Sequence, residues 1–331
     1  MRLTPDGVRA LALLAVLTLV GLTGCSSPSG SGAPTTTPAR VGTPSPVDLR
    51  QWITEFTDRI TPGGHYRVPG ERDRRAVADG VRALLDGHRA TAERALAEVG
   101  YGVRALVDRD SGQQVAEIAD TTADGEARRG WGRVYVDLRG PARWQVQVPH
   151  PTADLRSEQL GIGLLRAAPG GVLILAGAHR AAASDASGGA DDTGASDVAD
   201  VAHRRDSVFA AVSDALADRK LPAVQVHGFA DSSLPDEDVV VSTGKGDAGL
   251  RWARRLSGAL RARELRVCEV WERYCGRLEG RTNVEGDHAA AVKVPFLHVE
   301  HSRRVRGDDV LVEKAVRALA EVAGEWGAGS R

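Results

Sequence analysis

The run Trp144-Gln-Val-Gln-Val-Pro-His150 is the first of four short apolar stretches that each end at a histidine or a glutamate. The other three read Val172-Leu-Ile-Leu-Ala-Gly-Ala-His179, Ala223-Val-Gln-Val-His227 and Val294-Pro-Phe-Leu-His-Val-Glu300. Their length and β-branched content predict strands, and the helix-like stretches between them predict crossover connections. The alternation therefore predicts an α/β fold, with a mostly parallel central sheet and helices on both faces.

The part of the chain before these runs predicts the edge of the same sheet. Residues 48–61 and 71–98 carry apolar residues at helical spacing. Residues 102–108 and 114–119 are β-like and are joined through Asp-Ser-Gly, which is a turn signal. We therefore expect an edge hairpin near the N-terminus of the domain, with helices packed on it.

The first 24 residues predict a signal peptide. Arg2 and Arg9 flank the start of an apolar stretch, residues 10–20, that is too short to span a bilayer comfortably. The stretch ends in Leu22-Thr-Gly-Cys25, which resembles the lipobox of bacterial lipoproteins. The resemblance implies that Cys25 becomes the lipidated N-terminus and anchors the chain to the extracytoplasmic face of the cell membrane.

The composition of the remaining residues indicates how this part of the chain is organised. Residues 25–47 are rich in Ser, Pro, Gly and Thr and predict a disordered tether, and residues 48–331 suffice for a single α/β domain. The formal net charge is −1, and no basic stripe interleaved with aromatics occurs, so nucleic acid is not an expected partner. Cys268 and Cys275 enclose six residues, and outside the cytoplasm such a pair is more often a disulfide than two free thiols.

The four polar-ended runs predict one site, because ligands of an open parallel sheet bind beyond the carboxyl ends of its strands. His150 ends one strand, His227 ends another, and Glu158 lies in the first turn of the helix after His150. Two histidines and a carboxylate with an open fourth position form the ligand set of a hydrolytic zinc site. Asp154 is an alternative carboxylate ligand, and His203 is an alternative to His227.

The last run also carries a candidate base. On a strand, His298 and Glu300 face one side and His301 faces the other. A carboxylate beside a zinc-bound water can take its proton and pass it to a leaving amine. The alternative is that Glu300 only pairs with a neighbouring arginine. We predict that Glu300 is catalytic and that His298 contacts the substrate.

Candidate substrate contacts flank residues 181–200, a loop of Ala, Ser, Gly and Asp that is either a lid or an insertion. Arg180 precedes this loop, and His203 and Arg204 follow it. An arginine fork suits a substrate carboxylate. The alternative is that these arginines only solvate the loop.

Two other chemistries lack their motifs. The stretch Ser242-Thr-Gly-Lys-Gly246 lacks the upstream glycine spacing of a phosphate-binding loop. No Gly-x-Ser-x-Gly elbow occurs, so the usual signature of a serine hydrolase is missing.

The order of the site residues resembles that of the zinc-dependent N-acetylmuramoyl-L-alanine amidases, in which a histidine, a glutamate, a later histidine and a final glutamate follow each other. It is also similar to the zinc carboxypeptidase-like and N-formylglutamate amidohydrolase groups of the phosphorylase/hydrolase-like α/β fold. The resemblance covers residues 144–305 and implies zinc ligands at His150, Glu158 and His227, with Glu300 as the base. It implies an extracytoplasmic hydrolase of amide bonds, with peptide or a peptidoglycan fragment as substrate.

The spacing departs from both patterns. Seven residues separate His150 from Glu158, which is neither the short His-x-x-Glu of the carboxypeptidases nor the longer gap of the amidases. Two alternatives therefore stay open. One is a carboxypeptidase or poly-γ-glutamate-type hydrolase, in which Arg180 or Arg204 holds a free carboxylate. The other is a non-catalytic binding lipoprotein of the cell envelope.

Overall fold

The computed structural model describes residues 44–184 and 197–328. The chain divides into two units, Met1–Ala39 and Arg40–Arg331, and every described element belongs to the second. The signal peptide and the lipid anchor at Cys25 lie outside the described residues and stay predictions. The end of the predicted tether differs from expectation, because Ser45–Val47 form a strand, β1. No helix in the described ranges is long and apolar enough to cross a membrane.

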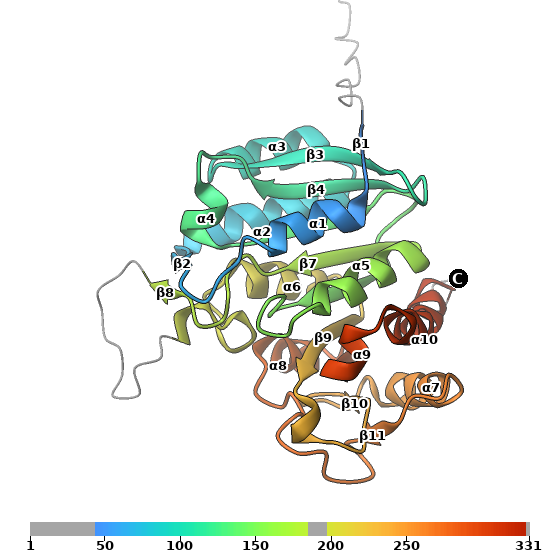
Figure 1. Cartoon of the computed structure of the whole chain (residues 1–331). Coiled ribbons are helices and arrows are strands. Elements are labelled where there is room, and N and C mark those ends of the chain that lie inside the picture. Colours follow the sequence, from blue (N-terminus) through green and yellow to red (C-terminus); the bar gives the residue numbers. More distant parts are fainter. Residues whose placement is uncertain (1–43, 185–196, 329–331) are drawn as a thin grey trace, which may run out of the picture. The chain divides into compact units, whose positions relative to one another are not determined.

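A ten-stranded sheet runs through this unit (Figure 1). Its strands, in spatial order, are β1 (Ser45–Val47), β3 (Tyr101–Asp108), β4 (Gln114–Asp120), β5 (Arg133–Asp137), β7 (Gly171–Leu175), β6 (Trp144–Val148), β9 (Ala223–Phe229), β12 (Phe296–Ser302), β10 (Val239–Ser242) and β11 (Val267–Glu269). Two further strands, β2 (His65–Tyr66) and β8 (Ala183–Ser184), pair with each other.

The four polar-ended runs form the centre of the sheet. Strands β7, β6, β9 and β12 are consecutive neighbours and run parallel, so their carboxyl ends meet at one edge. On either side of them, β5 and β10 run antiparallel. The predicted edge hairpin is β3–β4, and β1 pairs with the outer side of β3. The α/β fold class and its parallel centre are confirmed.

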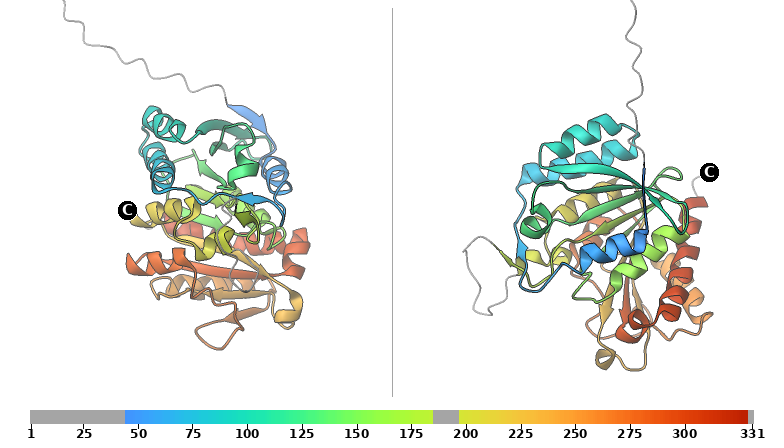
Figure 2. Two further views of the ribbon diagram at one scale, coloured as in Figure 1. Left: turned by 90° about the vertical axis from the view of Figure 1, so that its left-hand side faces the viewer. Right: turned by 45° about the horizontal axis from the view of Figure 1, so that its top comes forward.

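Helices cover both faces of the sheet, and the left view of Figure 2 shows α1 on one side and α2 and α3 on the other. One face packs against α1 (Leu49–Thr57), α5 (Ser157–Ala167), α7 (Leu250–Arg261) and α10 (Asp309–Ala328). The other face packs against α2 (Glu71–Leu85), α3 (Arg89–Ala97), α6 (Val208–Asp218) and α8 (Val284–Ala291). The connections hold α4 (Gly125–Arg129), α9 (Arg303–Gly307) and the 3-10 turns Asp197–Ala199, Val201–His203 and Asp231–Ser233.

The central strands place apolar side chains on one face and polar side chains on the other. In β9, Val224 and Val226 join the core under α5, whereas Gln225 and His227 face the side of α8, where Gln225 donates a hydrogen bond to Glu285. All of these polar side chains are buried, so they must find hydrogen-bond partners within the protein. The same face of the neighbouring strands carries Gln145, Gln147, His298 and Glu300.

Candidate metal centre

Three buried side chains, His150, Asp154 and His227, converge at the edge where the parallel strands end. Oδ2 of Asp154 lies 3.2 Å from Nδ1 of His227 and 3.6 Å from Nδ1 of His150. One ligand atom from each residue lies within 4.8 Å of the others, so a single cation can contact all three. A backbone turn explains the approach of Asp154, whose amide donates to the carbonyl of His150 at 2.8 Å.

The other ring nitrogen of each histidine has its own acceptor. Nε2 of His150 donates to Oδ1 of Asp200 at 2.8 Å, and Nε2 of His227 lies 3.0 Å from Oε1 of Gln225. Nδ1 of His150 is buried and has no hydrogen-bond partner among the described residues. In a neutral ring, an acceptor at Nε2 favours the hydrogen there and leaves the lone pair on Nδ1, which is how metal-ligating histidines are usually held. The donor set therefore fits a zinc ion.

Burial and neighbouring charges set the protonation of these groups. Burial lowers the pKa of His227 to about 4, so this ring is neutral near pH 7. Burial also disfavours charge on His150, but the neighbouring carboxylates of Asp154 and Asp200 prevail and raise its pKa to about 9. Burial opposes the charge of Asp154 as well, yet His150 and His227 hold the pKa of that carboxyl well below its usual range. The two carboxylates therefore favour positive charge at this point, from a proton or from a metal ion.

The three side chains open onto a cleft of about 330 Å³ that Glu300 and His298 also line. Oε1 of Glu300 lies 3.3 Å from Nε2 of His298, and its Oε2 is buried without a hydrogen-bond partner among the described residues. Glu300 is the register partner of His227 across β12 and β9. The carboxylate next to the candidate metal ligands therefore has one oxygen available to accept a proton.

Two predicted substrate contacts also line the cleft. Arg180 pairs with Asp200, while Nδ1 of His203 lies 3.2 Å from the same carboxylate and Nε2 of His203 lies 3.2 Å from Oγ1 of Thr282. Arg277 also lines the cleft. It is exposed and forms no ion pair with another described residue. One wall of the cleft is thus cationic and suits a substrate carboxylate.

Other predicted positions lie outside the cleft. Arg204 forms an ion pair with Asp206, at 2.7 Å between Nη2 and Oδ2, and does not line the cleft. His179, which ends the second run, lines a separate hollow beside Phe56, and its Nδ1 accepts from the amide of Ala181 at 3.1 Å. The structure therefore gives no support to a substrate role for Arg204.

The structure does not bring Glu158 to His150 and His227. Its carboxyl accepts from Nε2 of Gln159 at 2.9 Å and lines another hollow beside α1, and burial raises its pKa above the usual value. The cause is the chain between β6 and α5, which turns sharply at Arg156, where φ is +69°. This turn leaves Asp154, the alternative ligand, beside the two histidines.

Asp200 and Gln225 are second contacts of the two histidines that the sequence analysis did not assign. Nothing in the sequence pairs Asp200 with His150, because fifty positions separate them. A signal for Gln225 does exist, since it lies two positions before His227 on one strand and must share its face. Strand periodicity could therefore have found Gln225 but not Asp200.

A disulfide between Cys268 and Cys275 closes the short loop that follows β11. The segment after Cys275 forms one wall of the cleft, contributing Arg277, Thr282 and Asn283. The disulfide therefore restrains the chain that leads into this wall.

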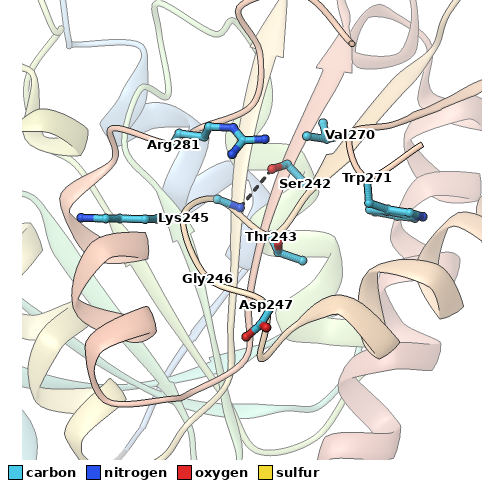
Figure 3. Close-up of a pocket in the computed structure, with 9 residues that line it drawn as sticks. Ser242, Thr243, Lys245, Gly246, Asp247, Val270, Trp271 and Arg281 are labelled. Carbon is cyan, nitrogen blue, oxygen red and sulfur yellow. Dashed lines mark hydrogen bonds between the residues drawn. The ribbon is translucent and has the colours of Figure 1, made fainter. Parts of the chain in front are cut away.

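A second hollow, of about 420 Å³, lies where residues 242–247 meet Trp271 and Arg281 (Figure 3). Its two cations are already paired, Lys245 with Asp287 and Arg281 with Glu279. The amide of Gly244 donates to Oγ of Ser242 at 3.0 Å and helps to fix the loop (Figure 3). Within the described ranges no cluster of metal-ligating residues falls here, so the cleft remains the candidate site.

No protein-family model and no curated protein matches the sequence. Among solved structures, the chain is similar to a bacteriophage poly-γ-glutamate hydrolase, at 12% identity over 59% of this chain and 89% of the other, with a TM-score of 0.37. It is also similar to an aspartoacylase family protein from Mesorhizobium loti, at 11% identity over 68% and 66% of the two chains, with a TM-score of 0.37. A third similar structure is the N-acetylmuramoyl-L-alanine amidase AmiC2 of Nostoc punctiforme, at 12% identity over 57% and 99%, with a TM-score of 0.28. Similarity this distant carries no argument about activity, so the function is argued from the cleft.

Proposed function

We propose that this protein is a zinc-dependent hydrolase of amide bonds. The convergence of Nδ1 of His150, Nδ1 of His227 and Oδ2 of Asp154 beside Glu300 carries the proposal. Two imidazoles and one carboxylate with a side open to a cleft are the ligand set of catalytic zinc sites. Asp154 takes the place that the sequence analysis gave to Glu158.

The residues around the ligands fit amide hydrolysis. When bound, zinc supplies Lewis acidity toward the scissile carbonyl and lowers the pKa of water toward neutrality. Oε2 of Glu300 accepts the proton of the attacking water and then gives it to the leaving amine. Nε2 of His298 lies 3.3 Å from the other oxygen of Glu300, so the two side chains lie next to each other in the cleft.

The substrate that fits best is a peptide with a free carboxylate near the bond that is cleaved. Arg277 faces the cleft and is available for a bidentate contact, whereas Arg180 is already paired with Asp200. Peptidoglycan peptides have such carboxylates, and the expected lipid anchor at Cys25 puts the enzyme near them. The same wall also suits a carboxypeptidase or a poly-γ-glutamate-type hydrolase, and assays on all three substrate classes separate these activities.

The test is zinc content, measured by elemental analysis of the purified protein and of three variants. We expect about one zinc per chain in the parent, since the site offers three ligands. His227→Ala and Asp154→Ala should lose it, while the matched control Glu158→Gln should keep it. A parent that holds no metal after zinc is supplied overturns the proposal and favours a non-catalytic binding lipoprotein. Loss of zinc in Glu158→Gln alone would contradict the ligand set.

We also propose that the enzyme is held at the extracytoplasmic face of the cell membrane through Cys25. The lipobox-like stretch before this cysteine supports the proposal. Fractionation of cells that express Cys25→Ser tests it. This variant should leave the membrane fraction, and a variant that stays there would contradict the anchor.

A further inference from the structure

A line of buried amide side chains crosses the sheet and ends at His227. Gln145 and Gln147 occupy alternate positions of β6, while Gln225 and His227 occupy alternate positions of β9. Gln147 and Gln225 are register partners in the parallel pair, so the four side chains share one face. The three glutamines are at most 1% exposed, so they can hydrogen-bond only within the protein.

The line has a fixed direction, because it begins at two backbone carbonyls. Nε2 of Gln145 donates to the carbonyl oxygens of Ser213 and Leu221, at 3.4 and 3.3 Å. Carbonyl oxygens only accept, so the NH₂ group of Gln145 must face them and its Oε1 must face the other way. Nε2 of Gln147 donates to this Oε1 at 2.9 Å.

The same orientation passes on to the second strand. Nε2 of Gln225 donates to Oε1 of Gln147 at 3.0 Å and to Oε2 of Glu285 at 3.0 Å. Both hydrogens of this amide are thereby used, and its Oε1 lies 3.0 Å from Nε2 of His227. Asn283 donates to the same oxygen and holds it in place. A primary amide has its donors at one end and its acceptor at the other, so one carbonyl anchor orients the whole line.

An acceptor at 3.0 Å favours hydrogen on Nε2 of His227, against Nδ2 of Asn283, a donor that lies 3.3 Å from the same nitrogen. A neutral imidazole has one N–H, and Oε1 of Gln225 favours it at Nε2. Oδ2 of Asp154, 3.2 Å from Nδ1, competes for the same hydrogen. If Nδ1 carried the hydrogen and donated it to Asp154, it would lack the lone pair that a metal ion needs.

We propose that Gln145, Gln147 and Gln225 form a directional relay that holds His227 in its Nε2–H tautomer and so keeps Nδ1 ready for a cation. The glutamines are positioning residues, because they act through His227. The value of the relay for zinc binding rests on the proposed function, whereas the tautomer of His227 does not.

The experiment measures the tautomer directly in metal-free protein labelled with ¹⁵N-histidine. Long-range ¹H–¹⁵N correlation spectra at pH 7 distinguish the two tautomers, and the signal that disappears in His227→Ala identifies His227. We expect the Nε2–H form in the parent and a shift toward the Nδ1–H form in Gln147→Met. The matched control is Gln113→Met, which removes an equally buried glutamine that donates to the carbonyl of Leu165.

Zinc affinity, measured by competition with a chromophoric chelator, is the second readout. Loss of a group that orients a ligand typically costs 10- to 100-fold in metal affinity, so we expect at least about a tenfold loss in Gln147→Met and none in Gln113→Met. Gln145→Met removes the donor to the two carbonyls and the acceptor of Gln147, but leaves Gln147 and Gln225 in place. It replaces Gln147→Met if that variant does not fold.

The outcomes separate the two proposals. An Nδ1–H tautomer in the parent, or a tautomer that does not respond to the relay variant, overturns the relay even if zinc binds. A parent without zinc affinity whose His227 still responds to the variant leaves the relay standing and overturns the zinc hydrolase.

Discussion

Oδ1 of Asp200 accepts a hydrogen bond from Nε2 of His150 at 2.8 Å, on the side of the ring opposite the candidate metal position. The same carboxylate pairs with Arg180 and lies 3.2 Å from Nδ1 of His203. Asp200 is 5% exposed, so these contacts are made away from bulk water. One side chain therefore orients a candidate ligand and holds part of the cationic wall.

We expect Asp200→Asn to weaken zinc binding about 10- to 100-fold, because the ring of His150 loses the carboxylate that orients it and raises its basicity. Competition with a chelator measures the effect. Asp206→Asn is the matched control, since Asp206 pairs with Arg204 outside the cleft. Equal zinc affinities in the two variants would show that Asp200 does not contribute to zinc binding.

Glu300→Gln should lower kcat about 10²- to 10⁴-fold, the usual contribution of a positioned acid–base group. Zinc content should stay at the parent value, because Glu300 is not among the three candidate ligands. Hydrolysis of a carboxylate-bearing peptide, assayed beside the control Glu158→Gln, measures the loss. A Glu300→Gln enzyme with parental kcat would show that the base lies elsewhere.

Glu285 should make stability fall as pH rises. Burial raises its pKa from 4.5 to about 8, so between these values the folded protein keeps a proton that the unfolded chain has lost. The free energy of unfolding should therefore decrease with pH over this window, by up to about 1.4 kcal/mol per pH unit from this group.

Denaturant unfolding between pH 5 and pH 8 measures this dependence. Glu285→Gln should flatten the curve, because a glutamine does not titrate. Glu93→Gln, on the surface of α3 and paired with Arg89, serves as the control and should leave the slope unchanged. A slope that survives in Glu285→Gln would assign the pH dependence to other groups.

The disulfide should stabilise the domain by about 2–3 kcal/mol, the loop-closure value for a ring of this size. The double variant Cys268→Ala/Cys275→Ala should lose this amount in denaturant unfolding. A reducing agent should destabilise the parent by a similar amount and leave the variant unchanged. If it destabilises both equally, its effect does not come from this disulfide.

The sequence predicted the fold because its decisive signals are local. Each central strand is a short apolar run, and the stretches between the runs require parallel crossovers, so the shared carboxyl edge follows without knowledge of any contact. The positions of His150, His227 and Glu300 at that edge follow from the same runs, and strand alternation places His298 beside Glu300.

Only the tertiary structure shows which further residues complete the candidate site around them. The choice of Asp154 over Glu158 depends on the turn at Arg156, which directs one carboxylate toward the histidines and the other toward α1. Asp200 contacts His150 from fifty positions away along the chain, and the periodicity of a helix or strand cannot predict such a contact.

In the glutamine relay, one part could be predicted from the sequence and another part only from the tertiary structure. Periodicity in the sequence places Gln145 with Gln147 and Gln225 with His227, each pair on one strand face. The register between β6 and β9, which brings Gln147 opposite Gln225, depends on the packing of the whole sheet. The sequence by itself determined which side chains share a face, and the three-dimensional packing determined which of them touch, because hydrogen bonds act over distances that the order of the chain does not specify.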